Sequence, residues 1–297
     1  ETVDRIKATY GLKPFDPSKL PGSGPPENKP VVLVHGLDDP GIVWMTLAPV
    51  LSDDGFSVLI LTYPNDQPIA ESARFFLKSL ESMPPGERIS IVAHSMGGLV
   101  AREMLTNPEL DYGAKADSGA LPRVDRLIMV GTPNHGSELA RFRIVMEIRD
   151  QLVSLSTGDY HWLRGVVDGV GEAGIDLTPG SEFLTRLNRR PHPPNVDMMV
   201  IAGVLSQEQK DEIDALATDL KDRVPDEGRG AGDTMEDMLL SMTRQIGDGL
   251  VPLTSARLPG IEFNIVSGTH LSMIRNLTAT SQRIPPAIPI IVEALGR

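Results

Sequence analysis

The stretch over residues 89–100 constrains the fold most, because an apolar run stops there at a serine and two glycines follow within three residues. Ile91 and Val92 belong to a β-branched run typical of a buried strand, and the residues after Ser95 favour a helix. Ala93 and Gly97 place small residues two before and two after the serine, where the strand and helix backbones nearly touch. The stretch therefore predicts a strand, a tight strained turn with Ser95 at its apex, and a helix.

The same alternation of apolar runs and helical segments recurs along the chain. Strands are predicted at 31–34, 56–61, 89–93, 127–130, 198–203 and 261–266, and helices at 42–51, 70–80, 96–105 and near the C-terminus through 291–295. Solid apolar strands that alternate with helices predict an α/β fold, with a mostly parallel sheet covered by helices on both faces. Ligands bind such sheets beyond the carboxyl ends of the strands.

One domain is expected over residues 31–297, after an N-terminal arm or linker over residues 1–30. Two insertions interrupt the alternation: one over about 137–194, predicted to form a lid, and a second helical one over about 206–246. A methionine stripe in the second insertion fits either core packing or a lid lined for an acyl chain, and Met238 and Met242 are its candidate substrate contacts.

Composition limits the class of protein and its partners. The chain has 297 residues, of which 40% are hydrophobic and 23% charged, as in soluble globular proteins. No apolar run approaches the roughly 18 residues of a membrane span. A net charge of −12 argues against nucleic acid and against electrostatic docking on anionic lipid, and transient hydrophobic contact with a lipid surface stays open.

The absence of cysteine excludes disulfides, thiolate metal sites and cysteine nucleophiles. The numbering starts at Glu1 and not at methionine, so cytoplasmic location and export after removal of an N-terminal segment are both open expectations. The sequence does not indicate an oligomeric state.

A serine hydroxyl becomes a nucleophile when a histidine accepts its proton and a carboxylate holds that histidine. His270 follows the last predicted strand, and Asp248 lies between two glycines in a turn just upstream of that strand. The order Ser95, Asp248, His270 accompanies a nucleophile elbow on this type of sheet. These three residues are the predicted catalytic set.

The other histidines and acids have competing interpretations. His94 should point away from the hydroxyl, His35 should shape its own loop, and His135 is a candidate substrate contact. His161 and His192 are interpreted as solvated or structural histidines. Asp233 and Asp237 could in principle serve as the acid, but Asp233 suits a helix cap and Asp237 has no turn to present it.

An oxyanion needs two backbone N–H donors aimed at it. Met96 offers one as the first residue of the helix after Ser95, and Leu37 offers the other because Gly36 permits close approach of the main chain. Trp44 is either a packing residue or a wall of an acyl pocket. Neither a cofactor nor a metal ion is expected.

Six motifs resemble those of the α/β-hydrolases, in the lipase and esterase branch that includes bacterial triacylglycerol lipases. They are VHGL at 34–37, AHSMGG at 93–98, GTPNHGS at 131–137, LTPGSEFL at 177–184, GDGLVP at 247–252 and GTH at 268–270. The resemblance implies hydrolysis of carboxylic esters through an acyl-enzyme on Ser95, and some relatives hold a structural calcium ion. The order of the triad and the apolar stripes of the two insertions favour esters with an apolar acyl chain. An acyltransferase or amidase with the same triad, or a non-catalytic lipid-binding module, are the alternatives.

Overall fold

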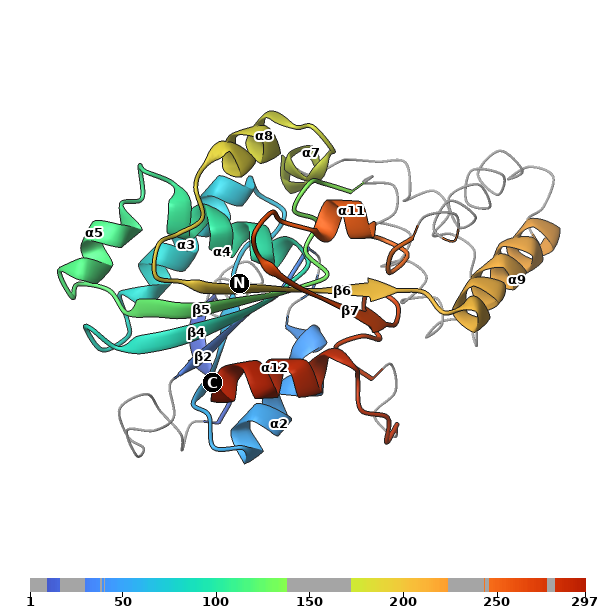
Figure 1. Cartoon of the computed structure of the whole chain (residues 1–297), viewed down its shortest axis with the longest axis horizontal. Coiled ribbons are helices and arrows are strands. Elements are labelled where there is room, and N and C mark those ends of the chain that lie inside the picture. The colour runs from blue at the N-terminus through green and yellow to red at the C-terminus, as the bar shows by residue number, and fades with distance from the viewer. Residues whose placement is uncertain are drawn as a thin grey trace, which may run out of the picture.

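The computed structural model describes residues 10–16, 30–37, 39, 41–137, 172–223, 243, 246–276 and 281–297. A seven-stranded sheet runs through the molecule in the order β1-β3-β2-β4-β5-β6-β7 (Figure 1). The strands are β1 (Gly11–Pro14), β2 (Val31–Val34), β3 (Val58–Thr62), β4 (Arg88–His94), β5 (Arg123–Val130), β6 (Asp197–Val204) and β7 (Glu262–Ser267). Among these seven strands only β1 pairs antiparallel, on β3, and the other five pairs are parallel. The predicted mostly parallel sheet is confirmed.

The central strands are apolar on both sides because helices cover both faces of the sheet. All four residues of β2 are buried, and β2 pairs with β3 on one side and β4 on the other. β5 begins four residues earlier than its apolar run. Its first half carries Asp125 and Arg126, which pair with Arg88 and Asp197 on the neighbouring strands, so its polar pattern did not predict a strand.

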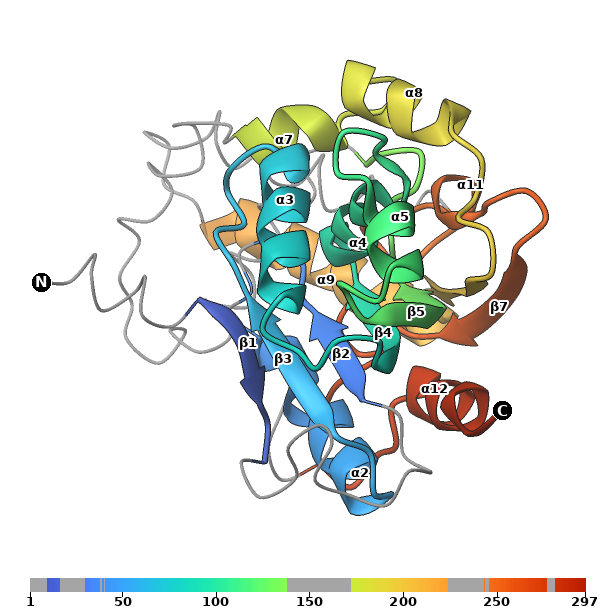
Figure 2. The same ribbon diagram turned by 90° about the vertical axis from the view of Figure 1, so that its left-hand side faces the viewer.

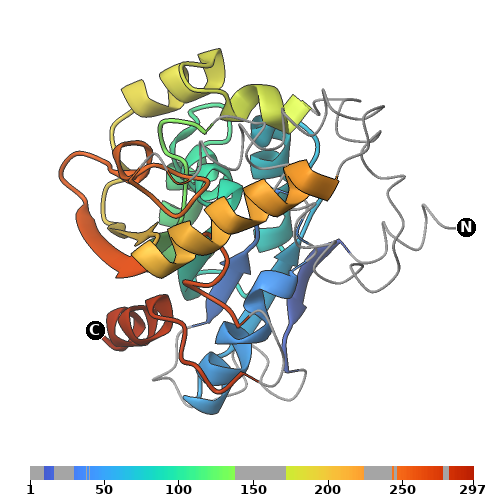
Figure 3. The same ribbon diagram turned by 90° about the vertical axis from the view of Figure 1, so that its right-hand side faces the viewer.

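Two groups of helices cover the two faces, as Figures 2 and 3 show from either side. One face carries α3 (Ile69–Leu80), α4 (Met96–Thr106) and α5 (Tyr112–Asp117), and the other carries η1 (Ile42–Met45), α2 (Leu47–Asp53) and α12 (Ala287–Gly296). The predicted helix over 42–51 is thus divided at Thr46. Its hydroxyl oxygen accepts a hydrogen bond from the Asn276 N–H at 3.1 Å.

Three described elements were absent from the expectations: β1, α5 and α11 (Leu253–Ala256). β1 lies inside the predicted N-terminal arm and forms an edge of the sheet. Its four residues include a glycine and a proline, which are depleted in strands, so its composition favours a linker.

The described parts of the two insertions are helical. α7 (Glu172–Leu177) and α8 (Glu182–Arg189) belong to the first insertion, and α9 (Gln207–Arg223) begins the second (Figure 3). Residues 138–171 of the first insertion and 224–242 of the second lie outside the described residues, so the lid stays a prediction. None of the helices in the described ranges combines the length and the apolarity that crossing a bilayer requires.

Candidate active site

Ser95 occupies a strained backbone position between β4 and α4. Its φ is 54° and its ψ is −130°, a region that side chains other than glycine rarely adopt. Three hydrogen bonds hold the turn: the Ser95 N–H donates to the Val130 carbonyl at 2.9 Å, and the Ser95 carbonyl accepts from the Thr132 hydroxyl at 3.0 Å and the Gly98 N–H at 3.1 Å. The surrounding structure therefore fixes a conformation that the serine alone would not prefer.

The two glycines after the turn permit this close packing. A Cβ atom on Gly97 would lie 2.3 Å from the Val34 carbonyl oxygen, and one on Gly98 would lie 2.1 Å from the Thr132 hydroxyl oxygen. Neither contact is sterically possible. Both glycines are thus required by the approach of α4 to the ends of β2 and β5.

The loop after β2 passes directly against the serine. A Cβ on Gly36 would lie 2.8 Å from the Ser95 Cβ and 3.2 Å from its Oγ. The loop is held by the Tyr63 hydroxyl, which donates to the His35 carbonyl at 2.7 Å, and by the Asn65 amide, which donates to the Gly36 carbonyl at 3.1 Å. Leu37, a predicted oxyanion donor, follows Gly36 in this loop.

Met96, the other predicted donor, is the first residue of α4. N–H groups in the first turn of a helix have no partner within the helix, and the helix dipole adds positive potential there. Ser95 is 3% exposed, and its Oγ has no hydrogen-bond partner among the described residues. The hydroxyl is therefore not committed to a structural contact in that part of the chain.

Asp248 and His270 form a buried pair. The His270 Nδ1–H donates to Asp248 Oδ2 at 2.8 Å, and the His270 main-chain N–H donates to the Asp248 carbonyl at 3.0 Å. The second carboxylate oxygen, Oδ1, accepts from the N–H groups of Leu250 at 2.9 Å and Val251 at 2.7 Å. Each carboxylate oxygen thus has donors, and the pair is fixed by both side chain and main chain.

Glycines also bring this pair to the end of the sheet. A Cβ on Gly203 would lie 2.7 Å from the Asp248 Cβ, and one on Gly131 would lie 3.1 Å from Nδ1 and Cε1 of His270. Gly131 directly follows Val130, whose carbonyl accepts from Ser95. Ser95 and the Asp248–His270 pair therefore lie at the carboxyl edge of the sheet.

His94 points away from the serine and toward the main chain of His270. Its Nε2–H donates to the His270 carbonyl at 3.0 Å, and the two rings have centroids 4.7 Å apart. Burial lowers the pKa of His94 well below its usual value, and the neighbouring His270 lowers it further. Burial also lowers the pKa of His35. Both rings are therefore neutral at pH 7.

The candidate substrate contacts lie in different surroundings. Trp44 is 1% exposed and meets the His94 ring edge-on at 6.4 Å, inside the core between the sheet and α2. His135 is exposed, and its Nε2–H donates to the Arg257 carbonyl at 3.1 Å. Met238 and Met242 lie outside the described residues, as do His161, Asp233 and Asp237. His192 is exposed and contacts the Pro259 carbonyl.

The structure adds residues to which the sequence analysis gave no role. Thr132 holds the elbow carbonyl, and Tyr63 and Asn65 hold the loop after β2. Thr132 stands inside a motif that was recognised, whereas Tyr63 and Asn65 follow β3 with no motif. Within the described ranges, no three His, Asp or Glu side chains form a group suited to a metal ion.

Three solved structures share this architecture. The mature form of the Bacillus licheniformis lipase BlEst2 aligns at 18% identity and a TM-score of 0.61, over 97% of this chain and 98% of that one. The metagenomic carboxyl esterase MGS0156 aligns at 18% identity and 0.57, over 90% and 74%. The phospholipase PlaB of Legionella pneumophila aligns at 17% and 0.58, over 90% and 60%.

At these identities the likeness shows the fold, which is that of the α/β-hydrolases, as the motifs implied. No curated protein matches the sequence. A family model described as a domain of unknown function, DUF7379, matches residues 66–243. The match includes Ser95, ends before Asp248 and covers more than half of the chain, which therefore belongs to the DUF7379 family.

Proposed function

We propose that the protein is a serine carboxylic ester hydrolase that works through an acyl-enzyme. One observation carries the proposal: Ser95 is held at a strained strand–helix turn, at the same sheet edge as a buried His270–Asp248 pair. Strain of this kind persists where the surrounding structure enforces it, and it is concentrated at functional sites. The lipases and esterases among the structural neighbours support the same class of reaction.

The proposed first step is attack of Ser95 Oγ on the ester carbonyl carbon, with transfer of the hydroxyl proton to His270 Nε2. The Nδ1–H of His270 donates to Asp248, so in the neutral ring Nε2 is the unprotonated nitrogen and can accept that proton. Asp248 then stabilises the imidazolium, because its carboxylate lies 2.8 Å from Nδ1.

The main-chain N–H groups of Leu37 and Met96 are assigned the role of stabilising the negative charge that develops on the carbonyl oxygen. Collapse of the tetrahedral intermediate breaks the C–O bond, and His270 returns the proton to the leaving alcohol. Water, activated by the same histidine, then hydrolyses the acyl-enzyme and releases the carboxylic acid.

The substrate is proposed to be a small-molecule ester or lipid with an apolar acyl chain. Ile42 and Met45, in the turn of helix that follows the Gly36 loop, are 47% and 46% exposed. Exposed apolar side chains on the segment that follows the Gly36 loop suit a substrate with one apolar and one polar end. The net charge of −12 disfavours an anionic acyl group.

Covalent labelling tests the proposal. A fluorophosphonate probe should attach to the wild-type protein, and mass spectrometry should place the adduct on Ser95, whereas Ser95→Ala should not be labelled. A panel of p-nitrophenyl esters with acyl chains of increasing length should show turnover that is lost in Ser95→Ala. Equal turnover by the two proteins, or a label on another residue, would overturn the assignment.

A further inference from the structure

Ser137 makes a buried contact with the turn that carries Asp248. It lies seven residues after the end of β5, is 2% exposed, and its hydroxyl donates to the Leu250 carbonyl at 2.5 Å. Leu250 is two residues beyond the acid. A buried hydroxyl with such a short contact on a neighbouring loop orders that loop, since breaking the contact would leave a buried carbonyl unsatisfied.

The accepting carbonyl shares a peptide plane with a donor to the acid. The C=O of Leu250 and the N–H of Val251 belong to one rigid planar unit, and that N–H donates to Asp248 Oδ1 at 2.7 Å. A rotation of this plane would move both groups together. The Ser137 bond therefore fixes the direction of the N–H that holds the carboxylate, and it polarises that N–H as well.

Ser137 is itself anchored by other contacts. Its main-chain N–H donates to the Leu177 carbonyl at 2.9 Å, and two residues earlier the His135 main-chain N–H donates to the Ser255 carbonyl at 3.0 Å. The hydroxyl thus comes from a fixed point outside the 247–252 turn. The turn is also tied to the fold through the carbonyls of Gly247 and Asp248, which accept from the main-chain N–H groups of Leu205 and His270, but these bonds do not end on the 250–251 peptide plane.

We infer that Ser137 is a positioning residue: through the 250–251 peptide plane it sets the orientation of the Asp248 carboxylate and, through it, of the His270 ring. This inference rests on the proposed function, because the orientation of the carboxylate and the ring matters for catalysis only if these groups act on Ser95. The hydrogen bonds of Ser137 end on Leu250 and Leu177 and not on Ser95 or His270, so its removal should lower kcat and leave KM unchanged.

The experiment compares Ser137→Ala with Ser255→Ala. Each variant removes one buried hydroxyl that donates to a main-chain carbonyl at 2.5 Å. The Ser255 hydroxyl, on α11, bonds to the Gly136 carbonyl, whereas the Ser137 bond ends on the peptide plane that holds Asp248. The melting temperatures of both variants are to be measured first, to establish that each variant folds. The downfield ¹H NMR resonance of the His270 Nδ1 proton, assigned by its absence from His270→Ala, reports the His270–Asp248 hydrogen bond without any substrate.

Ser137→Ala should shift or broaden this resonance, and lower kcat roughly tenfold, short of the about hundredfold that a 1 Å misplacement costs. Ser255→Ala should keep the wild-type resonance and kcat. The inference is overturned if the two variants behave alike, or if Ser137→Ala changes only KM. Failure of the proposed function would show separately, as a wild-type protein that the fluorophosphonate does not label, and the resonance would still test the positioning.

Discussion

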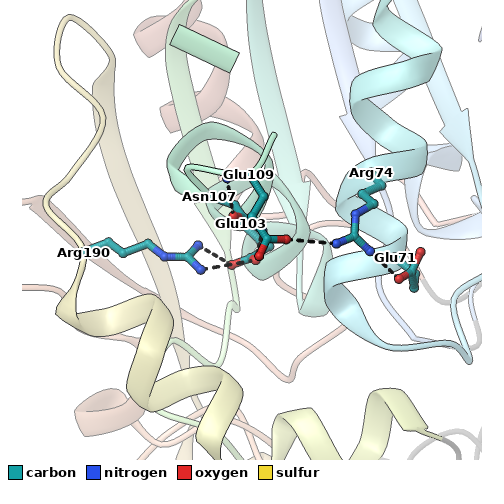
Figure 4. Close-up of polar contacts among 6 residues, drawn as sticks. All are labelled: Glu71, Arg74, Glu103, Asn107, Glu109 and Arg190. Atoms are coloured by element: carbon teal, nitrogen blue, oxygen red, sulfur yellow. Dashed lines mark hydrogen bonds and ion pairs between the residues drawn. The ribbon is translucent and has the colours of Figure 1, made fainter. Parts of the chain in front are cut away.

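The ion pair between Glu103 and Arg190 joins α4 to the end of α8, behind the elbow. The Glu103 side chain is fully buried, and that of Arg190 is 14% exposed, with 2.6 Å between Oε2 and Nη1 (Figure 4). The amide of Asn107 also donates to Glu103, at 2.9 Å. Glu103→Gln keeps the size of the side chain and removes its charge, so it tests what this carboxylate contributes to stability.

The structure indicates a large loss. Breaking a buried ion pair by removing one partner costs about 3–5 kcal/mol, because the other charge stays buried without compensation. Here two guanidinium groups lose the carboxylate: burial already lowers the pKa of Arg102 to about 10, and the charge of Glu103 opposes that lowering. Since Arg190 keeps some solvent contact, we expect about 3 kcal/mol, or a melting temperature lower by about 5 °C for a chain of this length.

Glu109→Gln is the matched control. Its carboxylate accepts from Arg74 at 3.1 Å, but its side chain is 72% exposed and that of Arg74 is 46% exposed (Figure 4). Exposed pairs contribute about 0–1 kcal/mol, so this variant should melt within about 1 °C of wild type. Calorimetry and urea titration of the three proteins at pH 7.5 give the comparison. Equal destabilisation by the two substitutions would refute the argument from burial.

Three further predictions concern the site. Asp248→Asn should lower kcat for a p-nitrophenyl ester about 10³–10⁴-fold with little change in KM, because the amide favours the wrong tautomer of His270; activity within tenfold of wild type would contradict the assigned role. Gly36→Ala should slow both ester turnover and fluorophosphonate labelling about a hundredfold, because its Cβ would stand 2.8 Å from that of Ser95; unchanged labelling would show that the loop yields. Burial lowers the pKa of His94 in the folded protein. When the pH falls below the pKa of a histidine in the unfolded chain, about 6.5, the unfolded chain binds a proton that the folded protein does not. The folded state is therefore stabilised less at low pH than at pH 7.5. Between pH 7.5 and 5.5 urea titrations should therefore show a loss about 1.4 kcal/mol larger in the wild type than in His94→Gln, which keeps the contribution of His35; equal losses in both proteins would contradict it.

Buried strands were predictable from the sequence because their surroundings are apolar on both faces. β2 was predicted with its observed bounds, and β4 and β6 within one residue at each end. The first half of β5 was missed because ion pairs across the sheet take the place of apolar contacts there. β1 was missed because a four-residue edge strand depends on its partner β3, which a local pattern does not contain.

The placement of the candidate site was predictable to the same extent. Local rules sufficed for Ser95, whose turn needs small neighbours, and chain order suggested Asp248 and His270. The supporting contacts were not predictable, because they join residues far apart in the chain. The hydrogen bonds from Ser137 to Leu250 and from Tyr63 to His35 form only when the folded chain brings these residues together.

Among the described strands, β7 has a neighbour on one side only, whereas β4 is paired on both. Edge strands take part in local opening at lower free energy than central ones, since fewer contacts hold them. The proposed base follows this edge strand, and the proposed nucleophile follows a central one. On warming, the segment that carries His270 should therefore unfold locally while the turn at Ser95 is still folded. Ester turnover would then be lost reversibly below the melting temperature of the whole molecule.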